Sequence, residues 1–161
     1  MHQMNQARWK HSSCQLAAYL YVFCGYNNDG YINSIEKLEI TEDPNLQINK
    51  QWELISESNF VHLPKLVMHF TIALNNEEIL IFGGLNYEEN KVHIFDTKTD
   101  KCKSIAVSGK FIFYNVYRGG LSSTQCGHNK VVALVKGYLD GCWKSCLVKY
   151  VKRTSSITIL H

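Results

Sequence analysis

The chain has 161 residues, 45% of them hydrophobic and 19% charged, which suits one globular domain spanning residues 1–161 and excludes a disordered protein. Six cysteines are too sparse for a disulfide scaffold, and no apolar run reaches the ~18 residues of a membrane span, so we expect a cytoplasmic protein with reduced thiols and no membrane contact. The net charge of +3 is concentrated in residues 108–161, which hold eight Lys or Arg and one Asp, and we interpret this excess as a solvated surface.

Apolar and alternating segments predict strands from the start of the chain. HSSCQLAA (11–18) precedes the apolar run YLYVF (19–23), and a third segment, NSIEKLEI, follows at 33–40. The run is expected to stop at Cys24-Gly25, because Asn28-Asp29-Gly30 just beyond is a strong turn signal. A shorter segment that carries Trp52 completes four antiparallel strands.

The same order of segments recurs twice. MHFTIAL (68–74), EILIFGGL (78–85) and NKVHIFDT (90–97) form the second occurrence, in which Asn75-Asn76 suits a hairpin turn through its tolerance of left-handed backbone. KVVALVKG (130–137) and CLVKYVKR (146–153) form the third. The units are residues 8–58, 59–107 and 108–161, and their period of roughly 53–59 residues is typical of propeller blades. A glycine at the end of each second strand lets the backbone bend where inner strands converge.

These repeats resemble the kelch repeat, in which an apolar strand ends in Gly-Gly, an aromatic residue lies near the end of the next strand and a Trp follows. ILIFGG with Phe95-Asp96 and LYVFCG with Trp52 carry the resemblance. Cys24, Leu38, Cys102 and Lys136 depart from the pattern. The resemblance implies an all-β fold, a partial kelch-type β-propeller of about three four-stranded antiparallel blades. Since a propeller closes only with more blades, it also implies a fragment, self-association, or a half-propeller formed against a partner.

The resemblance further implies a non-catalytic protein-protein interaction module, a scaffold or adaptor that binds another protein through the loops after the glycines. A Tyr recurs in each loop, and Tyr supplies a large contact area at low entropic cost. The candidate partner-binding residues are Tyr26, Asn27, Asn28, Asp29, Asn86, Tyr87, Glu88, Tyr138, Leu139 and Asp140. Turn chemistry alone is the competing explanation for the Asn and Asp residues.

Other kinds of chemistry have weaker signals. Zinc would accept Cys126, His128, Cys142 and Cys146, but their spacing is not that of a known finger or ribbon, so no metal or cofactor is expected. Some kelch-type propellers are enzymes, yet the sequence has no nucleophile elbow and no phosphate loop, so no enzyme is expected. His11 and His69 occupy corresponding points in two repeats, which favours a structural role.

Binding of nucleic acid is the remaining alternative. Basic and aromatic residues interleave near the end of the chain: Trp143, Lys144, Lys149, Tyr150, Lys152 and Arg153. Single strands bind such surfaces through phosphate contacts and base stacking. Strand alternation, however, predicts that Trp143 and Tyr150 lie in the core, so a nucleic-acid partner is not expected.

Overall fold

The computed structural model describes residues 3–47, 49–55, 63–85, 91–106, 123–125, 130–139, 142–154 and 156–160. For residues 123–125, 130–139, 142–148, 153 and 156–160 it describes the backbone alone. Over these residues the chain is all-β, as predicted, and the strands form four-stranded antiparallel sheets in chain order.

The sheets are three successive meanders. The first contains β1 (Ser12–Leu16), β2 (Tyr19–Asn27), β3 (Gly30–Glu39) and β4 (Glu53–Ile55). The second contains β5 (Phe70–Ala73), β6 (Glu78–Phe82), β7 (Lys91–Asp96) and β8 (Lys101–Ala106). The third contains β9 (Ser123–Gln125), β10 (Lys130–Leu139), β11 (Cys142–Val151) and β12 (Ser156–Leu160).

Helix is confined to two short turns in the described residues, α1 (Pro44–Gln47) and the 3-10 turn η2 (Lys152–Thr154). The α1 turn was not expected from the sequence. Asp43 initiates it, since the Asp43 carboxylate accepts a hydrogen bond from the Asn45 amide at 2.9 Å. No helix in the described part of the chain has the length and hydrophobicity needed to cross a membrane.

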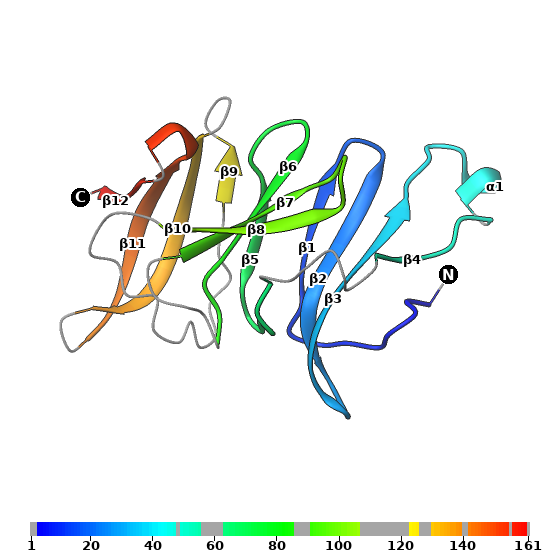
Figure 1. The fold of residues 1–161 in the computed structure, drawn as a ribbon, viewed down its shortest axis with the longest axis horizontal. Helices are drawn as coiled ribbons and strands as arrows, with labels where there is room; N and C mark the ends of the chain where they lie inside the picture. Colours follow the sequence, from blue (N-terminus) through cyan, green and yellow to red (C-terminus); the bar gives the residue numbers. More distant parts are fainter. Residues whose placement is uncertain are drawn as a thin grey trace.

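The three sheets lie in a row, with the second between the first and the third (Figure 1). Their leading strands are neighbours, because β1 contacts β5 and β5 contacts β9. Between the first two sheets the ring of Phe95 packs edge-on against Tyr21 and Phe23, with centroids 5.7 and 5.6 Å apart. Burial of such aromatic and aliphatic side chains is the main force that holds the sheets together.

The predicted strand stop at the glycine is correct for one sheet and wrong for two. β6 ends at Phe82, directly before Gly83-Gly84. β2 instead continues through Gly25 to Asn27, and β10 continues through Gly137 to Leu139. In β2 the ladder skips Cys24, because a β-bulge lies between Phe23 and Gly25, and pairing then resumes.

The backbone around the glycines repeats from the first sheet to the second. Trp9 pairs with Tyr26, and Val67 pairs with Leu85 in the same way. Lys10 and Met68, which follow the first members of these pairs, have left-handed φ angles of 57° and 58°. Hydrogen bonds then join the two sheets, from Gly25 N to Leu66 O at 3.0 Å and from Met68 N to Lys10 O at 2.9 Å.

The predicted turn at Asn75-Asn76 connects β5 and β6, but for a different reason from the one expected. Neither residue has a positive φ. The side-chain oxygen of Asn75 instead accepts hydrogen bonds from the amides of Glu77 and Glu78, both at 2.9 Å. The asparagine therefore acts through its side chain rather than through left-handed backbone.

Candidate partner-binding site

The tip of the β2–β3 hairpin holds the first set of predicted site residues. Tyr26 and Asn27 are the last residues of β2, and the exposed pair Asn28-Asp29 forms the turn. The Asn27 side chain accepts a hydrogen bond from the Asp29 amide at 2.9 Å, and Gly30 has a φ of 121°. Asn27 and Gly30 thus serve the turn itself, which leaves Asn28 and Asp29 as the polar groups available to a partner.

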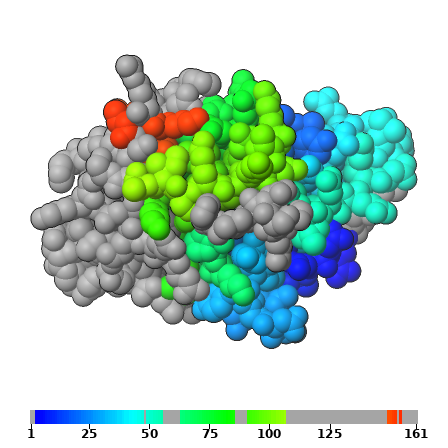
Figure 2. Space-filling model, viewed as in Figure 1, coloured from blue at the N-terminus to red at the C-terminus, as the bar shows by residue number. Residues whose placement is uncertain are grey.

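Three aromatic side chains form a cluster beside this turn. The ring of Trp9 packs edge-on against Tyr26 at 5.3 Å, and Tyr26 packs edge-on against Tyr31 at 5.0 Å. Tyr26 is half-buried, whereas Trp9 and Tyr31 are each 43% exposed. The hairpin projects at the lower side of Figure 1 and at the lower margin of the surface in Figure 2. We call Trp9, Tyr26 and Tyr31 the aromatic cluster.

Backbone pairing fixes this cluster in place. Trp9 N donates to Tyr26 O and Tyr26 N donates to Trp9 O, each at 2.9 Å, and Tyr26 is the ladder partner of Tyr31. The sequence interpretation missed Trp9 and Tyr31. Tyr31 could have been found, because a two-residue turn at Asn28-Asp29 places it directly opposite Tyr26.

The other two predicted sets of residues are outside the described residues or belong to a strand. Asn86, Tyr87, Glu88 and Asp140 lie outside the described residues. Tyr138 and Leu139 are the last two residues of β10, where they pair with Trp143 and Cys142, so they belong to a strand and not to a loop as predicted. Of the three predicted sets of loop residues, the set at the β2–β3 hairpin is therefore the one that lies on a surface the structure describes.

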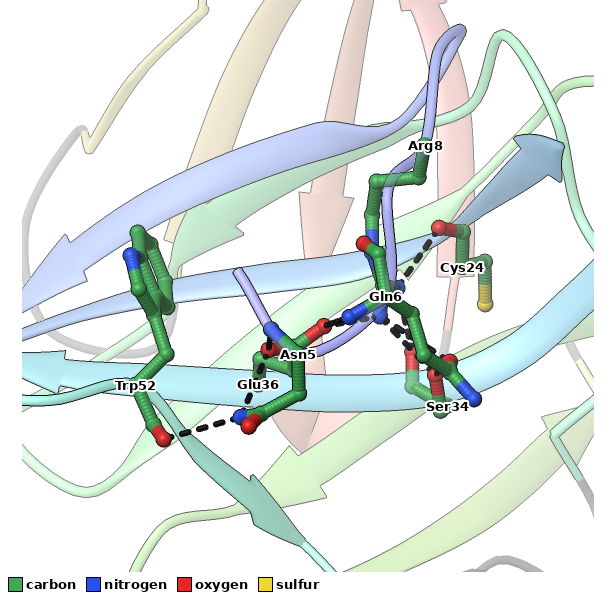
Figure 3. A network of polar contacts seen from close by, with 7 residues as sticks. All are labelled: Asn5, Gln6, Arg8, Cys24, Ser34, Glu36 and Trp52. Carbon is green, nitrogen blue, oxygen red and sulfur yellow. Dashed lines mark hydrogen bonds and ion pairs between the residues drawn. The ribbon is translucent and has the colours of Figure 1, made fainter. Parts of the chain in front are cut away.

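A buried polar network anchors the segment that carries Trp9 (Figure 3). Arg8 donates to the carbonyls of Cys24 and Ser34 at 2.9 and 3.0 Å, and to the Glu36 carboxylate at 2.6 Å. Asn5 and Gln6 also donate backbone hydrogen bonds to Glu36. The β-bulge takes Cys24 and Ser34 out of the ladder, so Arg8 satisfies carbonyls that the sheet leaves free.

The described thiols are poorly suited to covalent or metal chemistry. Burial raises the pKa of Cys14 to about 11 and the pKa of Cys24 and Cys102 to about 12, so all three stay protonated near neutral pH. Within the described residues no three His, Cys, Asp or Glu side chains are placed to hold a metal ion. Of the zinc candidates, Cys126 and His128 lie outside the described residues, and only the backbone of Cys142 and Cys146 is described.

Tyr150 and Lys152 belong to the basic segment near the end of the chain. Tyr150 is 3% exposed, so its ring is buried as alternation predicted and does not offer a stacking surface. The Lys152 ammonium pairs with the Glu78 carboxylate of the second sheet. Lys152 therefore joins two sheets rather than presenting a free charge.

His69 lies buried at the seam between the first two sheets. Its Cβ is next to Gly84, as the Cβ of His11 is next to Gly25, so the two histidines occupy equivalent positions. Among the described residues, neither ring nitrogen of His69 has a hydrogen-bond partner. Burial, together with the nearby His11 and His93, lowers the pKa of His69 to about 3. These features make His69 a structural residue that is neutral near physiological pH.

Stability is expected to fall as the pH drops below about 6.5, the pKa of His69 in the unfolded chain. Between pH 6.5 and the folded-state pKa of about 3, the unfolded chain binds a proton that the folded chain excludes. Stability present above pH 6.5 is thus lost on acidification, by roughly 1 kcal/mol between pH 7 and pH 5.5. Urea unfolding at pH 7 and 5.5 measures this loss, and His69→Leu should remove most of it. Equal wild-type stability at both values would contradict the assignment.

No protein-family model matches the sequence, and no curated protein matches it.

Proposed function

We propose that the three sheets are three blades of a kelch-type β-propeller, and that the chain is a non-catalytic protein-interaction module of the cytoplasm. Two features support the propeller. The leading strands β1, β5 and β9 are neighbours, as inner strands around an axis would be. The backbone around Gly25 in the first sheet and around Gly84 in the second has the same left-handed residue and the same isolated pair of residues.

The aromatic cluster carries the functional part of the proposal. Contacts between proteins depend most on Trp, Tyr and Arg side chains, and Trp9 and Tyr31 present such rings at a projecting tip. The cluster needs no folding on binding, because Tyr26 and the backbone pairs hold it rigid. A rigid surface loses little entropy when a partner binds.

Capture of partners from a native lysate tests the function. A double variant, Trp9→Ala with Tyr31→Ala, is expected to lose partners that the wild type retains. Leu46→Ala is the matched control, since Leu46 is 56% exposed on α1, away from the hairpin. Thermal unfolding establishes that the variants are folded. Retention of every partner by the double variant would show that the cluster is not the binding surface.

The proposal also has a consequence for assembly. The second sheet lies between the other two in Figure 1, so the three described sheets do not by themselves close a ring. Self-association of two chains is one way to complete it. Light scattering distinguishes a dimer from the 18.5 kDa monomer; a monomer would show that a second copy does not close the ring.

A further inference from the structure

The connections after β2, β6 and β10 hold acidic residues and no Lys or Arg. They are residues 28–29, 83–90 and 140–141, and their acids are Asp29, Glu88, Glu89 and Asp140. All three connect the second and third strands of their sheets. The β2–β3 and β10–β11 hairpins point toward the same side of the molecule (Figure 1). Each of these equivalent connections thus carries at least one acidic residue in the sequence.

Of the four acidic residues, Asp29 is the one that the structure describes, and its carboxylate is accessible to a partner. It is exposed, and it makes no ion pair with a cation of the described residues. Trp9 and Tyr31 lie beside the same turn, and no described Lys or Arg lies over either ring. Lys10, which is exposed, follows Trp9 directly in the chain and is the basic residue adjacent to the cluster in sequence.

We propose that Asp29 and the aromatic cluster bind a basic, arginine-containing segment of a partner protein. The inference rests on the proposed function and adds the chemistry of the partner. Arginine side chains stack on Trp and Tyr rings and also pair with carboxylates, so one residue type satisfies both features of the surface. Residues 1–58, which contain the hairpin, hold four Lys or Arg and seven Asp or Glu, so this part of the chain does not repel a basic segment.

Fluorescence anisotropy with labelled synthetic peptides tests this inference on the full chain. The probes are a Gly-Ser peptide containing several arginines and two analogues with lysine or glutamate at the same positions. The arginine peptide is expected to bind best, the lysine peptide more weakly and the glutamate peptide not at all. Binding of the arginine peptide should weaken as the salt concentration rises.

Variants locate the binding. Trp9→Ala and Tyr31→Ala are each expected to weaken binding about three- to tenfold, and Asp29→Asn about threefold. Lys10→Gln should strengthen it. Glu42→Gln and Leu46→Ala are the matched controls, an exposed acid and an exposed apolar residue elsewhere, and should bind as the wild type does. Asp29→Asn changes an exposed turn residue, so it keeps the test informative if Trp9→Ala does not fold.

Two outcomes would overturn the inference: no preference for the arginine peptide over the glutamate peptide, or wild-type binding by all three weakened variants. Failure of the proposed function is distinct from either of these. If the double variant loses lysate partners while no basic peptide binds, the interaction module stands and the basic partner is wrong. If the double variant keeps every lysate partner, the proposed function fails as well.

Discussion

Replacing Arg8 with alanine is expected to lower the free energy of unfolding by about 3–5 kcal/mol. The side chains of Arg8 and Glu36 are both fully buried. Without the guanidinium, the Glu36 carboxylate stays buried with no cation, and the carbonyls of Cys24 and Ser34 lose their donor. A buried charge without its partner costs far more than a lost surface contact. Urea denaturation at pH 7 measures the change.

Two further variants separate burial from charge. Lys98→Ala breaks an ion pair whose side chains are 68% and 52% exposed, and it should cost far less than Arg8→Ala. Arg8→Met combined with Glu36→Leu removes both charges, and it should recover part of the loss because no buried charge remains. If Arg8→Ala is as stable as Lys98→Ala, the network does not anchor the first sheet.

The strands were predictable because each depends on residues close together in the sequence. The apolar run at 19–23 and the alternation at 33–40 need only a neighbouring strand to bury them, and an Asn-Asp-Gly turn supplies it. The continuation of β2 beyond Gly25 was not predictable in this way. It depends on a bulge whose free carbonyls are satisfied by Arg8, a residue 16 positions before Cys24.

Comparison of the repeats could not have revealed the ion pair either. Trp9 and Val67 make equivalent pairs, so Leu66 occupies the position of Arg8 in the second sheet. His93 occupies the position of Glu36, by the pairing of Val22 with Glu36 and of Ile81 with His93. Leu66 and His93 are both buried but carry no comparable pair of charges. The network belongs to the first sheet and has no repeated signature.

Part of the candidate site was predictable because it depends on residues close together in the sequence. Tyr26 and Asp29 were found because they adjoin a recognisable turn. Trp9 was missed because its place depends on a bridge to Tyr26, 17 positions along the chain, and nothing local in the sequence indicates that bridge. Local pattern thus locates the hairpin, and long-range pairing decides which aromatic rings surround it.

Gly84→Ala is expected to lower the free energy of unfolding by about 3–5 kcal/mol. The two causes are left-handed backbone strain and steric crowding, and a variant at Gly30 measures the first of them alone. Gly84 has a φ of 95°, and an added Cβ would lie 2.5 Å from Val67 O and 2.9 Å from the Cβ of His69. Those atoms belong to backbone or adjoin it, so no side-chain rotation relieves the contact. The Val67–Leu85 pair and the seam around His69 would have to move.

Gly30→Ala is the matched variant, since Gly30 has a φ of 121° and an added Cβ would meet nothing within 4 Å. It carries the conformational cost alone, and we expect about 1–2 kcal/mol. The difference between the two variants, measured by urea denaturation, is then the cost of close approach between the second sheet and the segment that precedes it. Equal losses would mean that left-handed backbone, and not crowding, explains the glycine at the end of the strand. A larger loss for Gly84→Ala would show that crowding by Val67 and His69 adds to the cost of the left-handed backbone.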